Sequence, residues 1–161
     1  MNTIDLILLN FETTRNHSMQ TWRLIPDNYL DWRPDQEAYS FGEMIRHVWV
    51  GDYEYLHILK TGGLDPEEDI YQNVPITSVE QEIEYSHPHR QQLLDWIRNL
   101  PPEQLIEKSV ARPAKGYQRP LGDMLMRIAY HDSVHIGYFK QYLRMVQLEQ
   151  PNMALAYNEE W

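Results

Sequence analysis

The stretch SFGEMIRHVWVGDYEYLHILKTGG, residues 40–63, carries the clearest start and stop signals of a helix in this 161-residue sequence. Ser40 and Glu43 form a capping box, in which the Ser40 hydroxyl accepts from the Glu43 amide while the Glu43 side chain reaches back. Glycine is common directly after a helix, and two glycines stand here. The sequence therefore predicts a helix from Ser40 to about Lys60, with Gly62 or Gly63 as its C-cap.

Three further segments have the apolar spacing of helices that bury one face. The first runs from Thr3 to Ile25, and its apolar stripe is weaker in the middle. The next covers Val79–Leu100 and contains Pro88, so it either kinks there or consists of two segments. The last begins around Pro120 and ends at residue 147 or 148. Four helices of this length predict an all-α fold, a four-helix bundle, in a single domain over residues 1–161.

The segments between these helices contain proline, glycine and polar residues. Residues 64–78 are long enough to cross the bundle, so the helices need not alternate in direction. Residues 103–120 look irregular, with a short extended stretch around Val110, Ala111 and Gly116. A tail ending in YNEEW follows Pro151.

Composition narrows the class of protein. The formal net charge is -10, which disfavours nucleic acids and anionic membranes as partners. The start of the chain is neither a signal peptide nor a membrane span, so we expect a soluble cytoplasmic protein. There is no cysteine, and a metal ion would need histidine or carboxylate ligands.

Two histidines stand four residues apart in RIAYHDSVHIGYF, residues 127–139. Residues at this spacing are neighbours on one helical face, so His131 and His135 can reach the same metal ion. They overlap the apolar stripe of the last helix, and their side chains are expected to face inward or into a groove. Hydrogen bonding to other core groups would satisfy both imidazoles equally well, and the pair alone does not decide between these readings.

A third ligand would have to come from another helix, and His47 is the best candidate. It lies beside apolar residues, one turn before Gly51, which leaves room for a site. His17 is a possible lining residue of the same cavity. His87 and His89 flank Pro88 and are expected to face solvent.

The sequence HDSVH differs from the H-E-x-x-H helix of zinc proteases, because the general base of that motif is a glutamate and this chain has Asp132. We do not expect a protease. Asp132 is expected to orient His135 as a hydrogen-bond acceptor, or to be a solvated acid.

SFGEMIRHVWVGDYEYL and LGDMLMRIAYHDSVHIGYFKQYLR together resemble the DinB/YfiT-like family. The resemblance implies a four-helix bundle in up-down-down-up order and a divalent metal on His47, His131 and His135. It also implies a homodimer and a metal-dependent enzyme that uses a low-molecular-weight thiol. Many relatives continue the last motif as H-x-G-Q, where this chain has Tyr138.

These features favour a thiol S-transferase in which Zn, Ni or Fe holds the thiol, since imidazole suits each of these metals. Tyr138 and Glu54 are candidates for proton handling or substrate contact. The alternatives are a hydrolase that uses a metal-bound water, and a non-catalytic stress-related dimer with a structural metal.

Overall fold

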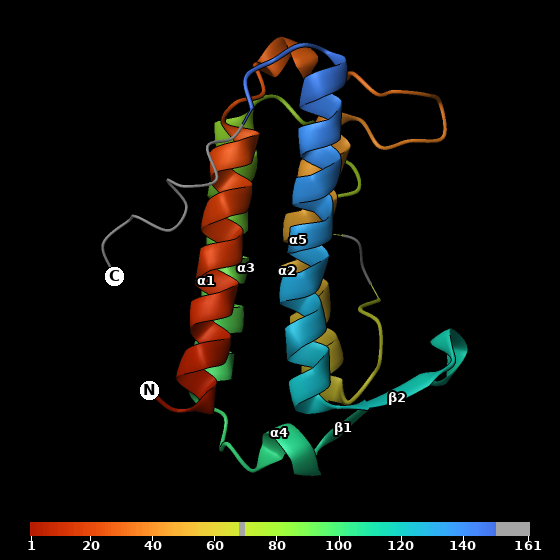
Figure 1. Ribbon diagram of the computed structural model, residues 1–161. Coiled ribbons are helices and arrows are strands. Elements are labelled where there is room, and N and C mark those ends of the chain that lie inside the picture. Colours follow the sequence, from red (N-terminus) through yellow and green to blue (C-terminus); the bar gives the residue numbers. More distant parts are fainter. Residues whose placement is uncertain (68–69, 151–161) are drawn as a thin grey trace.

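Four long helices make up most of the computed structural model, which describes residues 1–67 and 70–150 (Figure 1). They are α1 (Thr3–Trp22), α2 (Phe41–Thr61), α3 (Val79–Arg98) and α5 (Leu121–Met145). Figure 1 shows these helices side by side, with the short helix α4 and the two strands at one end. The predicted helices agree with the observed ones to within three residues at each end. The tail after Pro151 lies outside the described residues.

The ends of α2 follow the local signals in its sequence. The Ser40 hydroxyl accepts from the Glu43 amide at 3.2 Å, and the Glu43 carboxylate accepts from the Ser40 amide at 2.8 Å. Gly62 is the C-cap, with a left-handed φ of 79°. Helix α3 is one element with Pro88 inside it, so the alternative of two separate segments is wrong.

The fold is mostly helical, and it differs from the expected all-α fold because it also contains a small hairpin. Strands β1 (Ser109–Arg112) and β2 (Tyr117–Pro120) pair antiparallel. The Ala111 amide donates to the Gly62 carbonyl at 2.9 Å. A Cβ added at Gly63 would lie 1.8 Å from the Ala111 carbonyl oxygen, so this close approach requires glycine. The hairpin is thereby joined to the end of α2.

Three short helical elements were not predicted. Helix α4 (Gln104–Glu107) precedes the hairpin, and 3-10 turns cover Asp27–Tyr29 and Pro113–Lys115. All three are too short to show a helical period in the sequence. The extended stretch expected near Val110 is present as β1.

Two clusters of buried apolar side chains fill the bundle. The first includes Phe11, Leu56, Leu93 and Ala129, and the second includes Trp22, Trp49, Ile83 and Phe139. Each long helix contributes to both clusters. On each long helix one buried charged residue lies between the part that joins the first cluster and the part that joins the second. These four residues are Arg15, Asp52, Arg90 and Asp132.

The four charged residues pair with one another across the bundle. Arg15 Nη1 donates to Asp52 Oδ2 at 2.7 Å, and Arg15 Nε donates to Asp132 Oδ2 at 3.0 Å. Arg90 Nη1 donates to Asp52 Oδ1 at 2.9 Å. Two guanidinium groups and two carboxylates leave no net charge. Arg15 lies in the middle of α1 in place of an apolar side chain, and this explains why the apolar stripe is weaker there.

No helix in the part of the chain that the structure describes is long and apolar enough to cross a membrane.

Candidate metal centre

Three imidazoles from two helices converge at one point. His47 comes from α2, while His131 and His135 stand one turn apart on α5. The Nε2 atom of His131 lies 3.1 Å from Nε2 of His47 and 3.1 Å from Nε2 of His135. One potential ligand atom from each ring falls within 4.8 Å of the other two. The structure therefore brings together the three histidines that the sequence singled out.

The surroundings keep these imidazoles neutral. Burial, and then the proximity of His131 and His47, lowers the pKa of His135 to about 3. Burial and the proximity of His131 also lower the pKa of His47. For His131, burial lowers the pKa although Asp132 acts in the opposite direction. Neutral imidazoles have a free ring-nitrogen lone pair, as metal ligation requires.

The residues present fit a divalent metal ion. With metal–nitrogen bonds of about 2.0–2.1 Å in a tetrahedral site, neighbouring ligand atoms would be about 3.3 Å apart. Two of the three Nε2 pairs lie at 3.1 Å. A neutral imidazole has a single N–H. Hydrogen bonds among the three rings alone therefore cannot satisfy all three converging nitrogens. A metal ion would satisfy all three lone pairs at once.

The two weaker sequence candidates lie at the edge of this cluster. The Tyr138 ring stands edge-on to the His135 ring, with 5.6 Å between centroids, and about half of its surface is exposed. Glu54 is exposed. It lines a cavity of about 480 Å³ together with His47 and Tyr39. Tyr138 is therefore partly open to solvent beside His135, and Glu54 is exposed in a cavity that His47 also lines.

Two tyrosines that were not predicted as site residues lie beside the histidines. The Tyr39 ring stacks on His47 at 5.1 Å, and the Tyr55 ring lies edge-on to His131 at 6.1 Å. Tyr55 follows His47 by two turns of α2, with Gly51 between them, so their shared helical face was a usable signal. A Cβ at Gly51 would meet the Tyr55 ring at 3.5 Å. Gly51 thus lies against this ring.

Both readings of Asp132 are wrong. Its side chain is buried, with 2% of its surface exposed, and pairs with Arg15. The Nδ1 atom of His135 is buried and has no hydrogen-bond partner within the described residues. The ring of His135 is therefore held by packing, without the carboxylate acceptor that the sequence suggested.

The remaining histidines lie apart from the cluster. His17 lines a different cavity, between α1 and α5. His87 is exposed, as predicted. The prediction that His89 faces solvent is wrong, because His89 Nε2 lies 2.9 Å from the Tyr71 hydroxyl and its ring stacks on Trp49.

The chain is similar to a known protein family and to a solved structure. Residues 10–139 match the family model described as the DinB superfamily. The structure is similar to the crystal structure of a DinB-like protein, YjoA, from Bacillus subtilis, with a TM-score of 0.69 and 18% sequence identity. That match covers 92% of this chain and 96% of the other. A search of curated proteins finds no match.

Proposed function

Since the chain belongs to the DinB superfamily, we propose that it is a divalent-metal-binding protein and a metal-dependent enzyme of the thiol S-transferase type. His47, His131 and His135 are the proposed ligands. The observation that carries the proposal is the convergence of their three Nε2 atoms, two pairs of which lie at 3.1 Å.

The number of ligands supports a catalytic ion over a structural one. Structural zinc sites are almost always closed by four protein ligands, whereas catalytic sites have three and keep a position open. The group formed by the described residues has three donor side chains. His47 also lines a cavity of about 480 Å³, which is the proposed place for a small molecule.

A divalent ion held here would supply positive charge that favours the deprotonated form of a thiol or a water molecule. The protein residues would do the rest. Tyr39 stacks on His47 and restricts the orientation of that ring. Tyr138, which is about half exposed beside His135, is the first candidate for proton transfer to or from a substrate. Glu54, on the cavity wall, is a second candidate for proton transfer or substrate contact.

A thiol requirement distinguishes the transferase from the hydrolase. We expect turnover of an electrophilic substrate, such as an alkyl halide or epoxide, only when a small thiol is added to the metal-loaded protein. Hydrolysis at the same rate in thiol-free buffer would favour the metal-activated water instead.

The up-down-down-up helix order is part of this proposal. Along α1 and α5 the chain passes from the first apolar cluster to the second, and along α2 and α3 it passes from the second to the first. The 17 residues between α2 and α3 can span about 56 Å when extended, more than the length of a helix of about 30 Å.

We further propose a homodimer that acts on a small molecule in the cytoplasm. The net charge of -10 supports a partner other than nucleic acid or an anionic membrane.

Metal content tests the ligand assignment. Protein purified without a nickel column is expected to contain about one equivalent of Zn, Ni or Fe by elemental analysis. His131→Ala is expected to lose most of it, because two ligands hold an ion far more weakly than three. His87→Ala removes an exposed imidazole from α3 and is the matched control.

A full equivalent of metal in His131→Ala, with the same melting temperature as the control variant, would contradict the assignment.

A further inference from the structure

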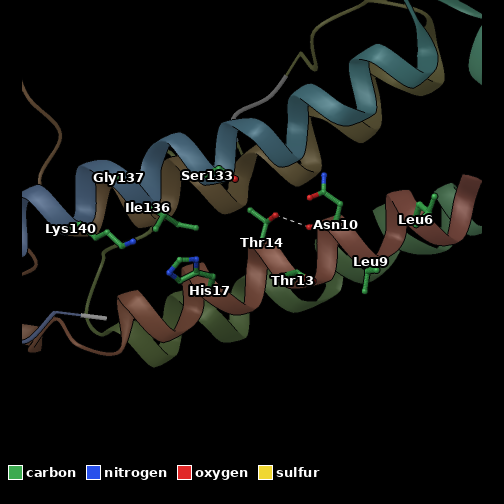
Figure 2. Close-up of a pocket in the computed structure, with 10 residues that line it drawn as sticks. All are labelled: Leu6, Leu9, Asn10, Thr13, Thr14, His17, Ser133, Ile136, Gly137 and Lys140. Carbon is green, nitrogen blue, oxygen red and sulfur yellow. Dashed lines mark hydrogen bonds between the residues drawn. The ribbon is translucent and has the colours of Figure 1, made fainter. Parts of the chain in front are cut away.

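The cavity that borders His47 is separate from the cavity between α1 and α5. The α1–α5 cavity has a volume of about 550 Å³ and is lined by His17 and Thr14, among other residues (Figure 2). The cavity that borders His47 has a volume of about 480 Å³, within the range of small-molecule sites. It is lined by residues of α2 and by residues 71–76, which precede α3. Since His47 is a proposed metal ligand, a molecule in this cavity would lie next to the metal centre.

This His47 cavity has a wall of apolar side chains. Val50, Tyr71, Val74 and Ile76 line it, and each of them is half-buried. Val50, Tyr71 and Ile76 also pack against the second apolar cluster, so this wall is continuous with the core. A Cβ added at Gly42 would lie 2.8 Å from Ile76 Cγ2, which places Ile76 directly against α2. A ligand that covers the wall would remove apolar surface from water.

Two charged residues of the same lining already bind protein groups. Glu43 caps the start of α2 and pairs with Arg33 at 3.0 Å. Arg46 pairs with Glu82 at 2.6 Å. Two further polar residues of the lining are exposed, namely Glu54 and Gln72. The half-buried part of the cavity therefore favours an apolar group over a charged one.

Tyr39 gives the His47 cavity a flat aromatic surface. Its ring stacks on His47, with 5.1 Å between the centroids and 23° between the ring planes. Half of the Tyr39 surface, 50%, is nevertheless exposed, and the residue lines the cavity. Aromatic rings attract one another in offset-stacked or edge-to-face arrangements. An aromatic ring that packs on Tyr39 would lie close to a ligand of the proposed metal ion.

Arg46 holds the apolar wall in place. Its Nε and Nη2 donate to the carboxylate of Glu82, a residue of α3 that is fully buried. The same guanidinium donates to three backbone carbonyls of the wall, those of Tyr71, Val74 and Pro75. Arg46 thereby fixes residues 71–75 to both α2 and α3.

We propose that the His47 cavity binds a planar aromatic group, with Tyr39 as the stacking surface and Val50, Val74 and Ile76 as the apolar wall. This inference rests on the proposed function, because it names the class of the substrate as an electrophile that carries an aromatic ring. Arg46 is a positioning residue, which acts through the wall.

An NMR titration with benzyl alcohol tests this inference without any turnover. The full chain is first mixed with one equivalent of Zn²⁺, which is diamagnetic. We expect saturable binding, with the largest shifts at the methyl groups of Val50, Val74 and Ile76. Cyclohexylmethanol has a similar size but no planar ring, and it should bind about threefold more weakly because it cannot stack.

Substitution of Tyr39 tests the stacking surface. Tyr39→Ala is expected to lower the affinity for benzyl alcohol about fivefold and the affinity for cyclohexylmethanol less, because only the first ligand loses ring stacking. Tyr39→Phe keeps the ring and should keep the affinity. Tyr39 is exposed, so the fold tolerates both changes. Tyr130→Ala removes a tyrosine of α5 that is 66% exposed, and this matched control should bind benzyl alcohol like the original chain.

Arg46→Lys tests the positioning of the wall. Lysine keeps a positive charge beside Glu82 but lacks the forked set of donors. Because the wall is then held less firmly, both alcohols are expected to bind about threefold more weakly, and their ratio of affinities stays as in the original chain. The zinc content should stay at one equivalent, since the three histidines are unchanged.

Three results would overturn the inference: no saturable binding of benzyl alcohol, equal affinity for cyclohexylmethanol, or unchanged affinity in Tyr39→Ala. Unchanged affinities in Arg46→Lys would overturn the positioning role. Failure of the metal proposal has a different signature. A chain that binds benzyl alcohol without taking up zinc retains the aromatic site and contradicts the metal site, whereas zinc uptake without benzyl alcohol binding overturns the present inference alone.

Discussion

Burial sets the protonation of the clustered imidazoles before any metal ion binds. The pKa of His135 is lowered to about 3 by burial and then by its two neighbours, so its ring is neutral at physiological pH. Metal ligation normally has to displace protons from its ligands. Since His47 and His131 also have lowered pKa values, the site is in its metal-binding protonation state in advance.

His89 should make stability depend on pH. Burial lowers its pKa, although Asp52 acts in the opposite direction. The unfolded chain therefore takes up a proton at higher pH than the folded chain, and the free energy of unfolding falls as pH drops from 7 to 5. Urea denaturation of His89→Gln is expected to show a smaller fall than the original chain.

His87→Gln is the control for that experiment, because His87 is exposed on the same helix. It should retain the full fall between pH 7 and pH 5. An identical fall in the original chain and in His89→Gln would show that His89 does not contribute.

The residues that form the site could be predicted because helical spacing is local. His131 and His135 share a face by virtue of being four apart. Asp132 and His89 were wrongly predicted because their partners, Arg15 and Tyr71, come from distant parts of the chain. Neither pairing leaves a periodic pattern in the sequence.

At the scale of elements, α1 holds together the two helices that carry the histidines. Arg15 contacts Asp52 on α2 and Asp132 on α5, the latter next to His131. Burial opposes the charge of Arg15, but the two carboxylates raise the pKa of its guanidinium. One side chain of α1 thereby links the two helices that carry the three histidines.

Arg15→Met is expected to destabilise the fold by about 3–5 kcal/mol, because it leaves Asp52 and Asp132 buried with less compensating charge. Arg23→Met removes an exposed pair with Glu80 and should cost less than about 1 kcal/mol. Urea denaturation at pH 7 measures both. Similar losses in the two variants would contradict a structural role for the buried network.

The elements with strong local signals were predicted well. The capping box predicted the start of α2 to within one residue, and Gly62 correctly marked its end. Helix α4 was missed because four residues show no period, and the hairpin depends on contacts with Gly62 and Gly63. Tertiary contacts of this kind cannot be inferred from neighbouring residues.

At the scale of the whole molecule, charged side chains occupy part of the interior of the bundle in place of apolar ones. The network of Arg15, Asp52, Arg90 and Asp132 lies between the two apolar clusters. Helix α5 has the candidate metal centre on one face and lines a second cavity with α1 on the other. The four long helices and the cluster of three histidines were predicted from the sequence and the family resemblance. The second cavity was not, because it depends on how α1 packs against α5.

The central claim is that the three imidazoles hold one divalent metal ion. The most direct test is a crystal of metal-loaded protein measured with X-rays at the absorption edge of that metal. We predict one strong anomalous peak about 2.0–2.2 Å from the Nε2 atoms of His47, His131 and His135. Well-ordered imidazoles with no anomalous peak between them, or a full-occupancy peak at other side chains, would contradict the claim.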